Sequence, residues 1–236
     1  MRLPVTRHLE ARARGVLTTP RPFVSEASAN WLTHALGLLL ALLATPPLVL
    51  AASATGDDGH VVGMAVYGLT LALLYASSTR YHLFQGRRGE YARLITDHVC
   101  IFLLIAGTQT AVCVLVMPPA AQFFYIGAMW MLALGGVIFK MVFGLRHERL
   151  GVGLYVLMGW LAVASLWPVA DGLSVGVVTM LLLGGVAYTA GLIFYARMWF
   201  GRVRYSHAIW HLMVVMGSAF HYLAIRSAID DVLRAA

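Results

Sequence analysis

Five polar side chains in an otherwise apolar sequence have the types and spacing of a metal-dependent active site. Ser78 and His82 are four residues apart, so they share one face of a helix. His207 and His211 have the same spacing. Three imidazoles with an open fourth position form a catalytic zinc site, with Zn–N distances of about 2.0–2.1 Å. Asp97 could then orient the water at the metal or accept its proton.

Each of these residues also has a simpler interpretation. An H-x-x-x-H pair is often two packed imidazoles, and His82 could be an interfacial side chain. Asp97 could stabilise the start of a helix, because acidic residues favour helix N-termini. Ser78 could bond to a carbonyl of its own helix. The metal hypothesis therefore depends on the whole set lying together.

The composition indicates where these residues must be placed. The chain has 236 residues, of which 60% are hydrophobic and 11% charged, against roughly 25% charged in soluble domains. The net charge of +7 comes from Arg and Lys in short clusters between apolar runs. Such clusters set membrane topology and contact anionic lipid head groups. We therefore expect membrane lipids as partners, and no nucleic acid.

Seven apolar segments are each long enough to cross a bilayer as a helix, which needs about 20 residues. They span residues 30–54, 60–83, 95–117, 120–144, 150–170, 173–198 and 206–228. The prediction is an all-α polytopic membrane domain over 30–228, with an Arg-rich N-terminal segment at 1–29 and a short tail at 229–236. Pro46 and Pro47 predict a kink in the first helix.

The distribution of basic residues predicts the orientation. Arg and Lys are frequent before residue 30 and around the second, fourth and sixth loops, whereas Arg226 and Arg234 fall on the other side. The positive-inside rule then places the N-terminus in the cytoplasm and, after seven crossings, the C-terminus outside. In this topology four of the candidates, His82, Asp97, His207 and His211, lie at one depth near the cytoplasmic face on three helices, and Ser78 lies one turn deeper.

Other polar residues inside apolar runs have structural interpretations. Cys100 and Cys113 point to nearly opposite sides of one helix, which excludes a mutual disulfide. His98 points away from Asp97 and is interpreted as a packing or interface residue. His221 lies about 20 Å along the helix from His207, too far for the same metal. We expect it to bond to another helix.

Four motifs resemble the haemolysin III family of bacterial proteins. They are Glu26-Ala-Ser-Ala-Asn30-Trp-Leu-Thr-His34-Ala-Leu-Gly37, Ser78-Thr-Arg-Tyr-His82, Asp97-His-Val-Cys-Ile-Phe-Leu-Leu-Ile-Ala-Gly107-Thr and Ser206-His207-Ala-Ile-Trp-His211. This family belongs with the progestin and adipoQ receptors, which include the adiponectin receptors. It is similar to the alkaline ceramidases, within a superfamily of membrane hydrolases.

The resemblance assigns roles to the matching positions. It implies that the three histidines of the second and fourth motifs bind Zn²⁺, with Ser78 and Asp97 as the polar pair beside the metal. Glu26, Asn30 and His34 match the first motif, for which the resemblance supplies no role. Their place at the inner end of the first helix lets them border the same cavity. For Glu26 we favour stabilisation of the helix N-terminus.

Three functions are consistent with these observations. The first is zinc-assisted hydrolysis of a lipid amide, or a role in membrane lipid homeostasis, in the cytoplasmic (inner) membrane of a bacterium. Ser78 would hydrogen-bond the developing oxyanion. The second is a receptor-like regulator in which structural zinc joins two helices. The third is a cytolytic pore, which the clustering of polar residues at one end makes less favourable.

Overall fold

The structure is a computed structural model that describes residues 25–200 and 203–235. Within these residues the chain forms seven long α-helices and one short 3₁₀ helix. They are α2 (Glu26–Ser53), α3 (Asp58–Leu83), α4 (Glu90–Val116), α5 (Pro119–Phe143), α6 (Glu148–Ala164), η1 (Trp167–Gly172), α7 (Val175–Phe200) and α8 (Ser206–Ala235). The all-α prediction is confirmed.

The helices have the length and surface of a multi-pass integral membrane protein. Six of them are long and apolar enough to cross a bilayer. Large apolar side chains such as Leu50, Phe123 and Met141 point outward and are mostly exposed, as expected for a surface in contact with lipid. The seventh helix, α6, has 17 residues. It ends at Ala164, ahead of Pro168, which cannot donate a backbone hydrogen bond to extend the helix.

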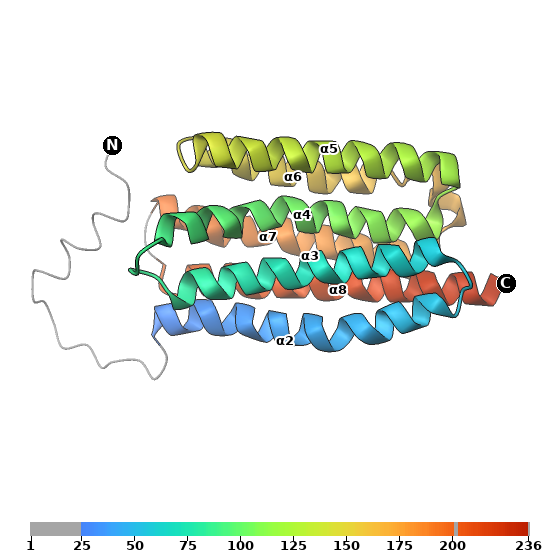
Figure 1. The fold of residues 1–236 in the computed structure, drawn as a ribbon, viewed down its shortest axis with the longest axis horizontal. Helices are drawn as coiled ribbons and strands as arrows, with labels where there is room; N and C mark the ends of the chain where they lie inside the picture. Colours follow the sequence, from blue (N-terminus) through green and yellow to red (C-terminus); the bar gives the residue numbers. More distant parts are fainter. Residues whose placement is uncertain (1–24, 201–202, 236) are drawn as a thin grey trace, which may run out of the picture.

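The first and last helices extend beyond their predicted limits. Helix α2 starts at Glu26 because Ser25 caps it, with its Oγ accepting a hydrogen bond from the Ser28 amide at 3.0 Å. Helix α8 continues through the predicted tail to Ala235. Pro46 and Pro47 lie inside α2, which is bowed in Figure 1.

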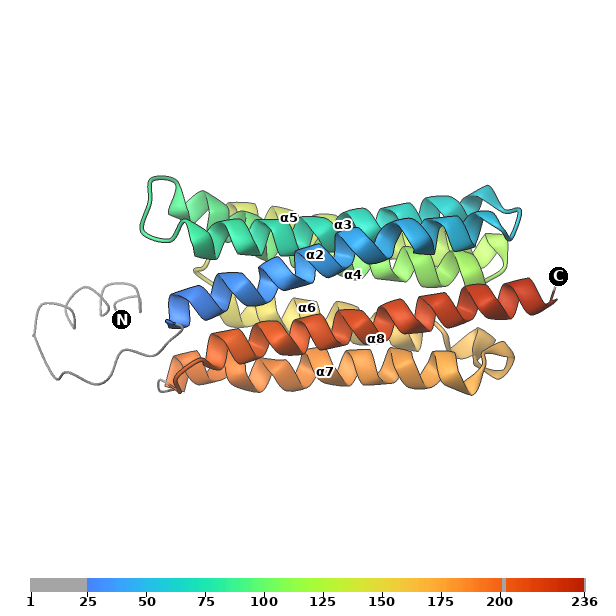
Figure 2. The same cartoon turned by 90° about the horizontal axis from the view of Figure 1, so that it is seen from below.

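The helices run up and down in sequence and close into a ring. Each helix packs against the next one in the chain, and α8 packs against α2. Helix α4 takes the inner position, with additional contacts to α6 and α8. Figure 1 and Figure 2 show that α2 starts and α8 finishes at opposite ends of the bundle. An odd number of helices that run up and down in sequence places the start of the first helix and the end of the last one at opposite ends of the bundle.

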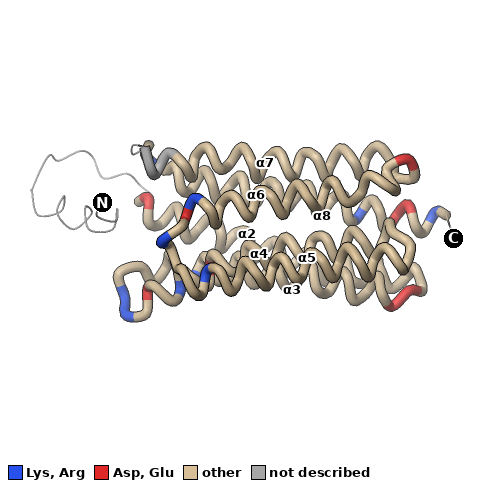
Figure 3. Tube along the Cα trace, turned by 90° about the horizontal axis from the view of Figure 1, so that it is seen from above, with Lys and Arg blue, Asp and Glu red and all other residues tan. Residues whose placement is uncertain are grey.

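Charged residues are divided between the two ends of the bundle, as Figure 3 shows. The end where α2 begins carries the basic loops that follow α3 and α5. The opposite end carries Asp57, Asp58, Asp171, Asp230 and Asp231, together with Arg226 and Arg234. This division agrees with the positive-inside argument, and the orientation in the membrane stays a prediction.

Buried hydroxyl groups join the helices in the interior of the bundle. Tyr75 of α3 donates a hydrogen bond to Ser218 Oγ of α8 at 2.8 Å. The hydroxyl of Tyr188, on α7, lies 2.7 Å from the same oxygen. His221 Nε2 donates to the Leu181 carbonyl at 3.3 Å, so the expected bond from this imidazole to another helix is confirmed. Cys100 and Cys113 are buried and free, also as predicted.

Candidate metal centre

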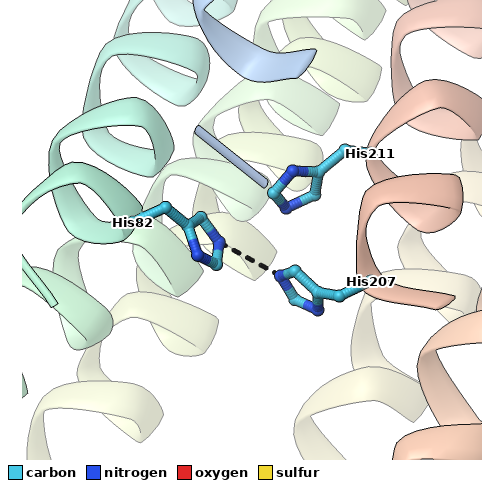
Figure 4. Close-up of side chains that lie close together, drawn as sticks. All are labelled: His82, His207 and His211. Atoms are coloured by element: carbon cyan, nitrogen blue, oxygen red, sulfur yellow. Dashed lines mark hydrogen bonds between the residues drawn. The ribbon is translucent and has the colours of Figure 1, made fainter. Parts of the chain in front are cut away.

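Three imidazoles converge at the end of the bundle where α2 begins (Figure 4). His82 comes from the last turn of α3, and His207 and His211 come from the first turns of α8. One ligand nitrogen from each ring lies within 4.8 Å of the other two. His82 and His211 are buried, with 5% and 2% of their surface exposed. The predicted convergence of α3 and α8 at one depth is confirmed.

The backbone of α2 fixes the orientation of His211. The Asn30 carbonyl oxygen lies 2.9 Å from His211 Nδ1. Because a carbonyl only accepts hydrogen bonds, Nδ1 must carry the proton. The lone pair is then on Nε2, which is the nitrogen left for a metal. Hydrogen bonding of the second ring nitrogen is the usual way in which proteins orient a metal-binding histidine.

The spacing between the other two rings also fits a metal. His82 Nε2 and His207 Nε2 are 3.1 Å apart. Two nitrogens that each lie about 2.0–2.1 Å from a tetrahedral zinc ion are separated by about 3.3–3.4 Å. The pair therefore needs only a small adjustment to bind one ion. Three imidazoles are a typical ligand set for zinc and also suit other first-row divalent ions.

Buried polar atoms without partners gather around the three imidazoles. Seven buried side-chain nitrogen or oxygen atoms in the described part of the chain have no hydrogen bond. Five of these belong to residues of the candidate site: Asn30 Oδ1, His34 Nδ1, His34 Nε2, Ser78 Oγ and His82 Nδ1. Such atoms are uncommon in folded proteins and usually interact with an ion, a water molecule or a ligand. Their concentration here favours a binding site over simple packing.

Ser78 and Asp97 lie near each other on adjacent helices, α3 and α4. Ser78 is 1% exposed and is one turn from His82 on α3. The Asp97 carboxylate, on α4, is close enough to interact electrostatically with the Ser78 hydroxyl. Ser78 Oγ nevertheless makes no hydrogen bond of normal geometry within the described residues. The two side chains therefore form a polar pair next to each other on α3 and α4.

Glu26, Asn30 and His34 of the first motif occupy different positions in the structure. Glu26 Oε1 accepts a hydrogen bond from the Tyr205 amide at 2.6 Å, which ties the start of α2 to the segment before α8. The structural interpretation of Glu26 is thereby supported. Asn30 contacts His211 through its carbonyl. The His34 ring stacks on His211 with a centroid distance of 3.6 Å. Of these three residues, Asn30 and His34 border the imidazole cluster, as does Thr33 of the same motif, whose Oγ1 lies 3.1 Å from His211 Nδ1.

A second group of ionisable side chains lies beside the site and was not predicted. Lys140 Nζ donates to Glu148 Oε2 at 2.6 Å, and Tyr195 donates to Glu148 Oε1 at 2.9 Å. His98 Nε2 lies 3.2 Å from the same Oε1 atom. This Glu148 cluster (His98, Lys140, Glu148 and Tyr195) joins four helices, α4 to α7. The interpretation of His98 as a packing or interface residue did not include this contact with Glu148.

One signal in the sequence could have revealed the Glu148 cluster. Lys140 falls inside a predicted apolar segment, and a lysine there needs a partner. The structure shows it fully buried. Its partner is the acidic residue at the start of the next helix, where negative charge is favoured.

Comparison with known proteins identifies the family. The family model described as "Haemolysin-III related" matches residues 24–222, which contain every candidate site residue. The chain belongs to the haemolysin III family. Hemolysin-3 of Bacillus cereus is 35% identical over 209 residues, covering 89% of this chain and 94% of the relative. The Hemolysin-3 homolog of Bacillus subtilis (strain 168) is 35% identical over 202 residues, covering 86% of this chain and 93% of the relative.

A more distant relative comes from an animal. The human monocyte to macrophage differentiation factor is 27% identical over 215 residues, covering 87% of this chain and 85% of the relative. It is a protein of the progestin and adipoQ receptor type. The resemblance found in the four motifs is thus confirmed for the haemolysin III family and for its receptor-like relatives.

Proposed function

We propose that this haemolysin III protein is a zinc-dependent hydrolase that acts on a lipid amide in the membrane. The observation that supports this most is the convergence of His82, His207 and His211, whose ligand nitrogens lie within 4.8 Å of one another. A zinc ion held by three imidazoles supplies a water molecule with a pKa of about 7 and polarises a carbonyl group. Hydrolysis of an amide requires both an activated water molecule and a polarised carbonyl group.

The remaining site residues have complementary tasks in this proposal. Asp97 would orient the attacking water and accept its proton as a general base. Ser78 donates a hydrogen bond to the oxyanion that develops on the substrate carbonyl. The acyl chain lies among the apolar side chains between the helices.

The proposed setting follows from the distribution of charge. The imidazole cluster is at the end of the bundle with the basic loops, and we place this end at the cytoplasmic face of a bacterial inner membrane. Arg87 and Arg88, in the loop before α4, are exposed at the same end. We expect them to contact anionic lipid head groups.

Removal of the metal tests the proposed activity. The detergent-purified chain, incubated with an N-acyl lipid carrying a fluorescent acyl chain, should release the fatty acid. Treatment with a chelator followed by dialysis should lower the rate at least about 100-fold, because zinc provides both the nucleophile and the electrophile. Stoichiometric zinc should restore the rate. The measurement is the rate of fatty acid release before chelation, after it, and after zinc is added back.

A regulator with structural zinc predicts a different result. The candidate ligands join α3 to α8, and Asn30 connects the cluster to α2. In this alternative the ion has a purely structural role, which is to hold α2, α3 and α8 together. In that case chelation lowers the thermal unfolding temperature while no fatty acid is released at any stage. Such a result would contradict the hydrolase proposal.

A further inference from the structure

His34 is a buried histidine to which the proposed mechanism assigns no role. Its side chain is 4% exposed, and neither ring nitrogen has a hydrogen-bond partner among the described residues. Its ring lies almost parallel to His211, with an angle of 19° between the two planes. An imidazole has one nitrogen that can donate and one that can accept. Within the described residues, His34 uses neither its donor nor its acceptor nitrogen.

The surroundings of His34 hold the ring in place. The edge of the Tyr75 ring packs against it, with a centroid distance of 5.2 Å and an angle of 80°. Gly37, one turn along α2, allows this approach, because a Cβ atom there would lie 2.6 Å from the Tyr75 ring. Tyr75 is itself fixed by its hydrogen bond to Ser218. The His34 ring thus lies in contact with the rings of both Tyr75 and His211.

Asn30 adds a third unused group next to His34. The two residues are four apart on α2 and share one helix face. Asn30 Oδ1 is buried and makes no hydrogen bond, whereas the Asn30 carbonyl orients His211. The α2 side of the imidazole cluster therefore offers one donor and two acceptors. Unpartnered groups of this kind usually mark the position of a ligand or a water molecule.

We propose that Asn30 and His34 bind an uncharged hydroxyl group on the head of the lipid substrate, beside the metal. This proposal rests on the proposed function and specifies which lipids the site selects. A hydroxyl matches the two residues, since it can donate to Asn30 Oδ1 while it accepts from the His34 N–H group. A phosphate ester does not match, because it has no proton to donate to Asn30 Oδ1 and prefers cationic donors. The subsite therefore selects neutral hydroxylated lipids over their phosphate esters.

Binding of lipids that cannot be hydrolysed tests the subsite without turnover. Three sulfonamide analogues of a short-chain N-acyl amino alcohol serve as probes: the free alcohol, its deoxy form and its phosphate ester. The zinc-loaded full chain should bind the alcohol at least about tenfold more tightly than the deoxy form, because loss of the hydroxyl leaves two buried groups unpaired. It should bind the phosphate ester more weakly than the alcohol.

Two variants connect this preference to the named residues. His34→Phe keeps a ring between His211 and Tyr75 but makes no hydrogen bond. Asn30→Leu keeps the backbone carbonyl that orients His211 and removes only Oδ1. In each variant we expect the alcohol to lose its advantage over the deoxy form, while zinc content and binding of the deoxy form stay at the wild-type level. The second variant provides the test if the first does not fold.

Three results would overturn the subsite. One is equal binding of the alcohol and the deoxy form by the wild type, which would mean that only water interacts with Asn30 and His34. Another is binding of the phosphate ester as tight as that of the alcohol. The last is a preference for the alcohol that survives both variants. None of these results depends on hydrolysis, so a failure of the subsite is distinguishable from a failure of the proposed activity.

Discussion

Replacement of Asp97 by asparagine is expected to lower the rate of lipid amide hydrolysis by about 10²–10⁴-fold, the range that a general base contributes. Asparagine keeps the size of the side chain but cannot accept a proton. Asp97 is not among the three imidazole ligands, so zinc content should remain at the wild-type level. The measurement is the rate of fatty acid release per zinc bound.

A matched control for this prediction lies at the other end of the bundle. Asp58, in the first turn of α3, is exposed and has no contact with the imidazole cluster. We expect Asp58→Asn to hydrolyse the lipid at the wild-type rate. If Asp97→Asn loses zinc together with activity, the carboxylate supports the site rather than the reaction. If it retains more than half of the activity, the proposed role of Asp97 is wrong.

The Glu148 cluster is expected to be the main electrostatic determinant of stability. Glu148→Gln removes the negative charge that faces Lys140 and His98. Because Lys140 is fully buried, its charge is then left without compensation. Breaking a buried pair in this way typically costs about 3–5 kcal/mol in the free energy of unfolding. Chemical unfolding in detergent, followed by circular dichroism, measures the change.

Two further variants show whether charge is the cause. Lys140→Met combined with Glu148→Gln removes both members of the closest pair, and we expect it to recover most of the lost stability. Arg226→Gln breaks an ion pair whose side chains are 40% and 38% exposed, so it should change stability by less than about 1 kcal/mol. A double variant no more stable than Glu148→Gln would contradict this account.

The sequence was sufficient to predict which residues meet across α3 and α8. A helix rises about 1.5 Å per residue, so the position of His82 near one helix end, and of His207 and His211 near another, fixes their depth. The order of the helices then brings both ends to the same side of the bundle. Spacing and topology together gave the imidazole cluster without knowledge of any side-chain contact.

The rotation of each helix about its axis is harder to predict. His98 points away from Asp97, and the sequence does not show which helix it faces. In the structure it faces Glu148, which lies 50 residues later in the chain. The carbonyl of Asn30 was also missed as the partner of His211, because every residue carries a carbonyl and its type gives no signal. Contacts of this kind depend on tertiary packing.

Helix limits deviated from prediction for local reasons. Apolar content alone did not include residues 26–29 in α2, although Ser25 and Glu26 are typical of a helix start. The predicted tail continues α8 because two ion pairs, Arg226 with Asp230 and Arg234 with Asp231, lie along the helix surface. Polar sequence at the end of a membrane helix therefore does not mark the end of the helix.

The metal content of the purified protein tests the central claim most directly. Mass spectrometry of protein prepared without chelator should find about one zinc per chain in the wild type, as expected for a single three-histidine site. The metal should be lost in His82→Ala, His207→Ala and His211→Ala. It should be retained in His221→Ala, which removes a histidine that lies on the same helix as His207 and His211 but is bonded to Leu181 of α7. A wild type without bound metal, or equal metal in all the variants, would contradict the account.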